Sequence, residues 1–341
     1  LVSAGDTRHT SAMARIFLTR EMPGDAARTL AQAGHTVVTW PGALPPPAVD
    51  LAAALATADA ALTTVVDAIS PEMLAAAARL KIVANMAVGY DNIDPAIAAG
   101  LGIWVTNTPG VLAETTADMA WALLMAAARN VARSDRETRA GAWQTWSPTG
   151  YLGVDVFGAT LGVIGLGEIG EAVARRAVGF KMRVLYHSRT RKPALEADLG
   201  LHHRQLPDLL AESDFVTVHT PLTPETRQLI GAAEFSAMKP SAILVNTARG
   251  GVIDQDALIE ALRAKAIAGA ALDVTTPEPL PLGSPLYTFP NVIITPHIAS
   301  ASFATRSRMA AMAAANILAV LSGGPPINPV NRPSPPRALD T

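Results

Sequence analysis

The chain has 341 residues, of which 50% are hydrophobic and 16% are charged, with a formal net charge of −2 and no cysteine. This length predicts two domains, because single cores seldom grow beyond about 250–300 residues. The near-neutral charge argues against a nucleic-acid surface, and the lack of cysteine excludes disulfides and thiolate chemistry; we expect a cytoplasmic protein without a metal site.

The ends of the chain and its apolar runs bear on targeting. The longest uncharged apolar runs, 119–128 and 309–321, are shorter than the roughly 18–20 residues that span a bilayer, so we expect no membrane association. Residues 1–12 are polar and lack the hydrophobic core of a signal peptide. Met13 precedes the first strand-like run, so we interpret it as the natural start and residues 1–12 as an extension without function.

Short strand-like runs alternate with alanine-rich segments between residues 15 and 107, which predicts a parallel βα layer. A helix is expected from about 112 to 129. An irregular connector that contains Trp143 and Trp146 follows it. The strands predicted in this first layer are 16–19, 36–39, 60–64, 81–84 and 103–106.

A second series of strands and helices begins near residue 160. Six strands with helices between them are what a doubly wound dinucleotide-binding sheet needs. A long helix, 302–321, then precedes a proline-rich tail, 325–336, which we expect to be a surface arm ending in disorder. The strands predicted in the second series are 160–164, 183–186, 215–219, 242–246, 269–272 and 292–295.

The order of these segments predicts an α/β protein in which one domain is inserted into another. We assign residues 13–107 plus 299–331 to a substrate-binding domain, 108–298 to a dinucleotide-binding domain and 332–341 to the tail. Ligands of such sheets bind beyond the carboxyl ends of the strands, so we expect a cleft between the two domains.

Residues 161–170, LGVIGLGEIG, contain the pattern G-x-G-x-x-G between a predicted strand and a predicted helix. Glycine permits the sharp turn and the close approach of a pyrophosphate, and the helix N-terminus offers unpaired N–H groups to the phosphates. The glycine pattern alone is weak evidence for a dinucleotide site, and its position between a predicted strand and a predicted helix strengthens that evidence. The residues that we assign to cofactor binding here are Gly165, Leu166, Gly167, Glu168 and Ile169.

The second strand of such a sheet normally ends in an acidic residue that binds the ribose of NAD. Here it ends in VLYHSRT, with Ser188 at the position of the acid and Arg189 and Thr190 after it. A carboxylate would repel the 2′-phosphate of NADP, whereas an arginine and hydroxyls can bind it through charge-assisted hydrogen bonds. We therefore predict NADP(H) in preference to NAD(H); the alternative is that 189–192 is only a solvated basic turn.

Three later segments carry polar residues at strand ends: NTARG at 246–250, LDVTTPEP at 272–279 and TPHIAS at 295–300. Together with VGYDNID at 88–94, HTPLT at 219–223 and the glycine pattern, they resemble the D-isomer-specific 2-hydroxyacid dehydrogenases, most closely the glyoxylate/hydroxypyruvate reductase branch. The resemblance covers nearly the whole chain from residue 15 to 331. It implies two Rossmann-like doubly wound domains, a flavodoxin-like substrate domain and an inserted NAD(P)-binding Rossmann domain.

The family's catalytic arginine, acid and histidine match Arg249, Glu278 and His297. Reduction of a 2-keto acid needs a hydride donor, a proton donor at the keto oxygen and a cation for the carboxylate. His297 would donate the proton, Glu278 would stabilise its imidazolium, and Arg249 would bind the carboxylate and polarise the keto oxygen. The resemblance also implies that the backbone N–H groups of Val88 and Gly89 hold the carboxylate. Taken singly, the side chains of Arg249, Glu278 and His297 could each have a structural role instead.

The resemblance assigns further residues to the cofactor. Thr247, Ala248 and Asp273 would lie near the nicotinamide, where Asp273 could accept a hydrogen bond from the carboxamide or only cap a local turn. The residues expected to line the rest of the cofactor site are His219, Pro221 and Ala299.

The segment around Trp143 and Trp146 resembles one that reaches across a homodimer and closes the partner's substrate pocket. We assign Trp146 to that contact; the alternative is that both indoles pack at the interface without touching substrate.

The leading hypothesis is NADPH-dependent reduction of glyoxylate and hydroxypyruvate to 2-hydroxy acids. Alternatives are a broader 2-keto acid reductase, a phosphite- or formate-oxidising relative, and a corepressor-like module that binds the cofactor without turnover. Formate enzymes of this kind have glutamine at the position of Glu278, which argues against them. Thr275, Thr276 and Ala299 depart from the usual family pattern, which leaves the shape of the pocket wall and the preferred substrate open. The sequence does not rank the substrates, because their side chains differ by only a few atoms.

Overall fold

The computed structural model describes residues 13–338, which form two compact α/β units. One unit comprises residues up to 112 and those from 302 onward, and the other comprises residues 113–301. The predicted domain boundaries, after residues 107 and 298, lie slightly earlier in the chain. The predicted extension, 1–12, and the last three residues of the predicted tail lie outside the described residues.

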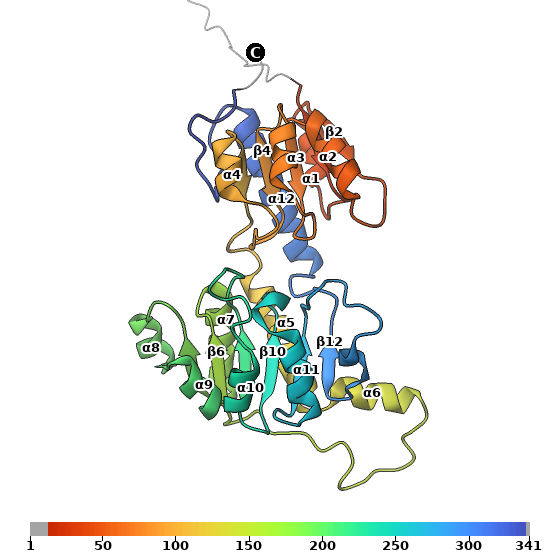
Figure 1. The fold of residues 1–341 in the computed structure, drawn as a ribbon, viewed down its shortest axis with the longest axis vertical. Coiled ribbons are helices and arrows are strands. Elements are labelled where there is room, and N and C mark those ends of the chain that lie inside the picture. The colour runs from red at the N-terminus through yellow and green to blue at the C-terminus, as the bar shows by residue number, and fades with distance from the viewer. Residues whose placement is uncertain (1–12, 339–341) are drawn as a thin grey trace, which may run out of the picture. The chain divides into compact units, whose positions relative to one another are not determined.

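The first unit contains a five-stranded parallel sheet with the order β2-β1-β3-β4-β5, the flavodoxin-like arrangement (Figure 1). Its strands are β1 (Arg15–Leu18), β2 (Thr36–Thr39), β3 (Ala60–Thr63), β4 (Ile82–Asn85) and β5 (Trp104–Thr106). Its helices are α1 (Ala26–Gln32), α2 (Ala48–Thr57), α3 (Pro71–Ala76), α4 (Pro95–Gly100) and α12 (Phe303–Leu321).

Alternating side chains divide the core of this unit between the two faces of the sheet. Along β1, Ile16 and Leu18 pack with α1 and α12, whereas Phe17 packs with α2, α3 and α4. Both faces are therefore buried, which explains why β3 and β4 are nearly continuous runs of apolar residues in the sequence. The final helix, α12, completes a core whose strands lie within residues 15–106.

The proline-rich segment after α12 differs from the expected surface arm. The backbone N–H of Val330 donates to the Val105 carbonyl at 2.8 Å, and the N–H of Arg337 donates to the Gly102 carbonyl at 2.9 Å. Side-chain atoms of Asn331 bond Val105, Pro95 and Ile103. The segment follows the edge strand β5 because these backbone groups would otherwise be unpaired.

The second unit contains a seven-stranded parallel sheet with the order β12-β11-β10-β9-β6-β7-β8 (Figure 1). Read from β8, this is the 3-2-1-4-5-6 order of dinucleotide-binding sheets with one strand added, so the predicted fold is confirmed. β8 has only two residues and leaves no apolar pattern, so the sequence analysis missed it. The strands are β6 (Thr160–Ile164), β7 (Arg183–His187), β8 (His202–His203), β9 (Phe215–Val218), β10 (Ile243–Asn246), β11 (Gly269–Leu272) and β12 (Val292–Ile294).

Helices cover both faces of this sheet. Buried residues of α5 and α7 form one core cluster with it, and those of α9, α10 and α11 form the other. No helix within residues 13–338 combines the length and apolar character needed to cross a bilayer. The helical segments are α5 (Ala113–Ala128), α6 (Val131–Arg139), α7 (Glu168–Ala177), η1 (Val178–Phe180), α8 (Pro193–Leu199), α9 (Leu206–Glu212), α10 (Ala232–Ala237), η2 (Gly250–Val252), α11 (Gln255–Arg263) and η3 (Pro285–Thr288).

Candidate active site

The glycine pattern forms the turn between β6 and α7. Gly165 has a φ of 93°, and a side chain there would also meet the His219 carbonyl at 2.8 Å. A Cβ at Gly170 would overlap the Gly165 carbonyl, whereas one at Gly167, the N-cap of α7, would meet no described atom within 4 Å. The first turn of α7 therefore packs close to β6, with open space at Gly167.

Unpaired polar atoms lie at the carboxyl ends of the two neighbouring strands, β9 and β10. His219 Nδ1, Thr220 Oγ1 and Thr247 Oγ1 are buried without a hydrogen-bond partner in the described chain. His219 Nε2 contacts Thr217 Oγ1 at 2.8 Å, and burial lowers the pKa of the imidazole to about 3, so it is neutral at pH 7. Because buried polar atoms are normally paired, these residues fit a polar ligand, and with the glycine turn they suit a dinucleotide cofactor.

The turn after β7 contains the residues assigned to the 2′-phosphate. Ser188 Oγ donates to the Thr190 carbonyl at 2.6 Å, and Arg189 is exposed without a hydrogen bond to the described residues. In the loop that follows β9, the hydrogen bond from Thr223 is the main cause that lowers the pKa of the Glu225 carboxyl, and the charge of Arg189 adds a weaker effect.

The other arginine of this turn has a structural partner. Arg191 binds Glu196 through Nε and Nη2 at 2.8 Å each, and hydrogen bonds from Arg191 and then Tyr186 lower the pKa of Glu196 to about 2. The Tyr186 hydroxyl also accepts from the Lys192 N–H at 2.8 Å. This network, which the sequence analysis missed, fixes the end of the turn and leaves Arg189 as the arginine that can meet a phosphate.

The turn after β10 positions Arg249. Buried Asn246 holds it at both ends, since Oδ1 accepts from the Ala248 N–H at 3.0 Å and Nδ2 donates to the Arg249 carbonyl at 2.9 Å. The half-buried Arg249 side chain donates through Nη1 to the Ala248 carbonyl at 2.8 Å. A Cβ at Gly250 would overlap the Thr275 carbonyl, so glycine lets this turn approach the loop that carries Glu278.

Asp273, at the end of β11, organises the segment that carries His297. Asp273 is 1% exposed, and its carboxylate accepts from the N–H groups of Ile298 at 2.9 Å and Ala299 at 2.7 Å, and from Thr295 Oγ1 at 2.6 Å. Both oxygens therefore have local donors, as in the capping alternative. A contact between Asp273 and the carboxamide stays a prediction.

His297 and Glu278 form a hydrogen-bonded pair. His297 Nδ1 lies 2.8 Å from Glu278 Oε2, and both side chains are 28% exposed. Glu278 Oε1 accepts from the Thr275 N–H at 3.1 Å, which orients the carboxylate. His297 has a φ of 54°, uncommon for a residue other than glycine, and its N–H donates to the Asp273 carbonyl at 2.9 Å. Backbone contacts thus fix the imidazole where Glu278 meets it.

Apart from Trp146, the assigned residues of the second unit lie at the carboxyl ends of its strands, at one edge of the sheet. They follow β6, β7, β9, β10, β11 and β12, which are neighbours, and the carboxyl ends of parallel strands lie together. Pro221 belongs to the same edge, where its carbonyl accepts from Thr226 Oγ1 at 2.6 Å. Val88 and Gly89 belong to the first unit, in the half-buried loop that follows β4.

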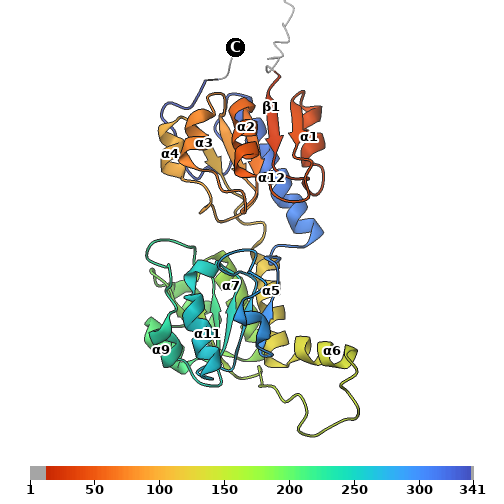
Figure 2. The same ribbon diagram turned by 45° about the vertical axis from the view of Figure 1, so that its right-hand side comes forward.

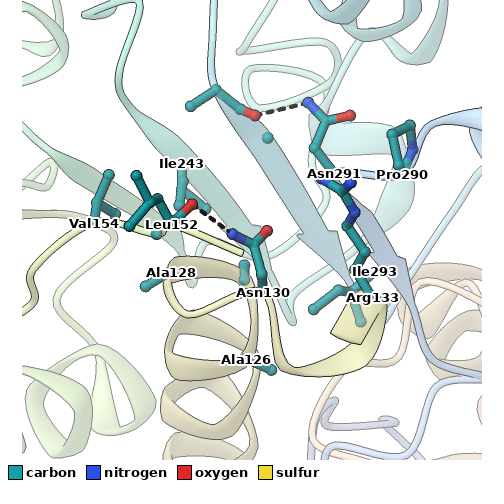
Figure 3. A pocket seen from close by; sticks show the side chains of 14 residues that line it. Ala126, Ala128, Asn130, Arg133, Leu152, Val154, Ile243, Pro290, Asn291 and Ile293 are labelled. Atoms are coloured by element: carbon teal, nitrogen blue, oxygen red, sulfur yellow. Dashed lines mark hydrogen bonds between the residues drawn. The ribbon is translucent and has the colours of Figure 1, made fainter. Parts of the chain in front are cut away.

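The segment with the two indoles projects from α6 in the second unit (Figure 2). Trp146 is 78% exposed and Trp143 is 62% exposed. A cavity of about 250 Å³ lies nearby, lined by Asn130 and Arg133 and by the residues at the amino ends of β10, β11 and β12 (Figure 3). This cavity lies at the amino ends of the strands, whereas the cofactor and catalytic residues assigned above follow the carboxyl ends. None of those assigned residues lines the cavity.

Comparisons with known proteins show which family the chain resembles. Residues 121–299 match the family model described as D-isomer specific 2-hydroxyacid dehydrogenase, NAD binding domain. The chain is 49% identical over 322 residues to a glyoxylate reductase from Aeropyrum pernix, which covers 93% of this chain and 96% of the relative.

Solved structures give the same result. A protein from Thermus thermophilus superimposes with a TM-score of 0.88 at 48% identity, over 93% of this chain and 99% of that one. An NADPH-dependent glyoxylate/hydroxypyruvate reductase from Sinorhizobium meliloti, crystallised with NADP and malonate, has a TM-score of 0.81 at 33% identity, over 96% of this chain and 100% of the other.

Proposed function

The chain belongs to the D-isomer-specific 2-hydroxyacid dehydrogenase family, in its glyoxylate reductase branch, and from this premise we propose that it reduces glyoxylate and hydroxypyruvate to 2-hydroxy acids with NADPH. A nicotinamide cofactor supplies the hydride when bound. The observation that carries the proposal is the 2.8 Å contact between His297 Nδ1 and Glu278 Oε2, because it prepares a proton donor for the alkoxide that hydride addition creates.

His297 delivers this proton. With Nδ1 committed to Glu278, the proton that reaches the substrate oxygen comes from Nε2, and the carboxylate stabilises the imidazolium before transfer. Hydride addition to C2 breaks the C=O π bond, and the proton from Nε2 completes the hydroxyl. The neutral histidine then regains a proton from solvent.

Arg249 binds the substrate carboxylate and polarises the keto oxygen. Its planar fork suits a carboxylate, and the Asn246 contacts hold the backbone turn from which the side chain extends. In the first unit, the backbone N–H groups of Val88 and Gly89 are further donors for a carboxylate.

NADP(H) is the preferred cofactor in this proposal. The absence of an acid at the end of β7, the exposed Arg189 and the engagement of Arg191 by Glu196 support it. Glu168 and Ile169, at the start of α7, would present their backbone N–H groups to the pyrophosphate, as would Leu166 in the turn before them.

Initial rates with glyoxylate, hydroxypyruvate, pyruvate and phosphite, followed at 340 nm with each cofactor, test the activity and the cofactor together. We expect turnover of the first two and a higher kcat/KM with NADPH than with NADH. Arg189→Ala should lower kcat/KM for NADPH roughly 10- to 100-fold, because one or two charge-assisted hydrogen bonds to the 2′-phosphate are lost. The kcat/KM for NADH should stay nearly unchanged. A wild-type preference for NADH would refute the cofactor assignment, and tight NADPH binding without turnover would favour the corepressor-like alternative.

The exposed segment around Trp146 supports a homodimer. α6 has no buried residue, and Trp143, Trp146 and Leu152 are each more than half exposed. Large exposed apolar side chains in one segment are typical of an interface. A second copy of the chain would cover them.

Light scattering should give a mass near twice the chain mass of 35.4 kDa. If Trp146 reaches the partner's substrate pocket, Trp146→Ala should raise KM for glyoxylate and keep the dimer mass. A shift of this variant to the mass of one chain, or no change in KM, would support the alternative that the indole only packs.

A further inference from the structure

Three successive carbonyl groups of the loop after β4 have fixed partners in the first unit. The Ala87 carbonyl accepts from the Thr108 N–H at 2.8 Å. The Val88 carbonyl accepts from Asn107 Nδ2 at 2.8 Å, and the Gly89 carbonyl accepts from Asn85 Nδ2 at 3.0 Å. The loop is therefore held by groups at the carboxyl ends of β4 and β5.

These contacts also set the direction of the N–H groups of Val88 and Gly89. In a planar trans peptide, the C=O of one residue and the N–H of the next point in opposite directions. Fixing the Ala87 carbonyl thus fixes the Val88 N–H, and fixing the Val88 carbonyl fixes the Gly89 N–H. Neither N–H has a hydrogen-bond acceptor among residues 13–338. Val88 lies in a bend of the chain, and consecutive N–H groups in such a turn can bind an anion.

Asn107 is itself anchored from the far end of the chain. Its N–H donates to the Asn328 carbonyl at 3.4 Å. Asn328 is held in turn by Asn316 of α12, which is fully buried and bonds both the N–H of Asn328, at 2.8 Å, and its side-chain oxygen, at 3.1 Å. The backbone of Asn107 is therefore tied through Asn328 to the buried Asn316 of α12, which holds the side-chain amide that bonds Val88 in place.

Asn85 secures the other side of the loop. It is fully buried, its Oδ1 accepts from Thr63 Oγ1 at 3.1 Å, and its Nδ2 also approaches Asn92 Oδ1 at 3.2 Å. Asn92 donates to the carbonyls of Thr64 and Asp67. Because Asn85 has so many partners, its replacement would disturb the whole loop, whereas the printed side-chain contact of Asn107 is with Val88 alone.

We propose that Asn107 is a positioning residue that aims the Gly89 N–H at the carboxylate of the 2-keto acid. This inference rests on the proposed function. Without the Asn107 amide, the peptide between Val88 and Gly89 can rotate, and the N–H no longer has a fixed direction. The effect falls on binding of the carboxylate, which is present in the ground state and the transition state alike, so it should change KM more than kcat.

The test compares Asn107→Ala with wild-type enzyme. We expect KM for glyoxylate to rise roughly 10- to 100-fold, with kcat within about threefold and KM for NADPH unchanged. The dissociation constant of oxalate, a two-carbon dicarboxylate that cannot be reduced, should rise by the same factor when titrated into enzyme saturated with NADPH. Asn107→Ser keeps a short hydrogen-bond donor, so its KM for glyoxylate and its oxalate dissociation constant should lie between those of the wild type and Asn107→Ala. This second variant also provides the test if the alanine variant does not fold.

Asn331→Ala is the matched control. Asn331 is also an amide that holds backbone groups beside β5, including the Ile103 carbonyl at 2.9 Å, but it does not contact the loop. It should lower the melting temperature and leave KM and the oxalate constant unchanged. An unchanged oxalate constant in both Asn107 variants would overturn the inference. Wild-type enzyme that binds oxalate but reduces no 2-keto acid would contradict the proposed function and still allow this test.

Discussion

Replacement of His297 by Gln should lower kcat for glyoxylate by about 10²- to 10⁴-fold, the usual contribution of a positioned general acid. Glutamine is close to histidine in size and can still bond Glu278, but its amide cannot deliver a proton. KM for glyoxylate and for NADPH should change by only a few fold. Steady-state rates at 340 nm measure all three values.

The exposed His202 of β8 provides the control for this substitution. His202→Gln makes the same chemical change away from the assigned edge of the sheet and should keep wild-type kcat. Near-normal turnover of the His297→Gln enzyme would refute the assignment of His297, whatever the control shows.

Replacement of Arg249 by Lys should lower kcat/KM for glyoxylate by about 10²- to 10³-fold. Lysine keeps the charge but loses the planar fork, so one ammonium cannot both pair with the carboxylate and polarise the keto oxygen. KM should rise and kcat should fall, because the polarising contact strengthens as charge develops on the oxygen. NADPH affinity, measured by fluorescence titration, should stay the same.

Arg263→Lys is the matched control, since Arg263 is an exposed arginine of the same unit that pairs with Glu260 at the surface. Its kinetics should equal those of the wild type. An Arg249→Lys enzyme with wild-type kcat/KM would show that Arg249 is a structural residue, the alternative that the sequence alone could not exclude.

The sequence predicted every strand of the two sheets except β8, because the apolar runs of the others are long enough to recognise. It also predicted the doubly wound dinucleotide-binding fold, from the alternation of strands and helices, and the family, from motifs at strand ends. It missed β8, with two residues, and expected a surface arm where the segment after α12 follows β5 through single backbone bonds to Val105 and Gly102. Short strands and backbone pairing leave no side-chain pattern.

The sequence also could not predict contacts between segments that are distant in the chain. The sequence assigned Arg189 to the 2′-phosphate by its position after Ser188, and only the structure shows that Glu196 engages Arg191. Whether Asp273 contacts the carboxamide or caps a local turn depended on how the end of β11 meets the segment after β12, which the sequence does not show. Asn107 and Val88 are nineteen residues apart, and no periodicity predicts that they touch.

Transfer of a labelled hydride tests the central claim most directly. Wild-type enzyme is given glyoxylate and NADPH that carries deuterium at the transferred position of C4, and the product is examined by mass spectrometry and NMR. Direct hydride transfer predicts glycolate with one deuterium at C2 for each NADPH consumed. Glycolate without deuterium at C2, or no product while NADPH is bound, would contradict the account.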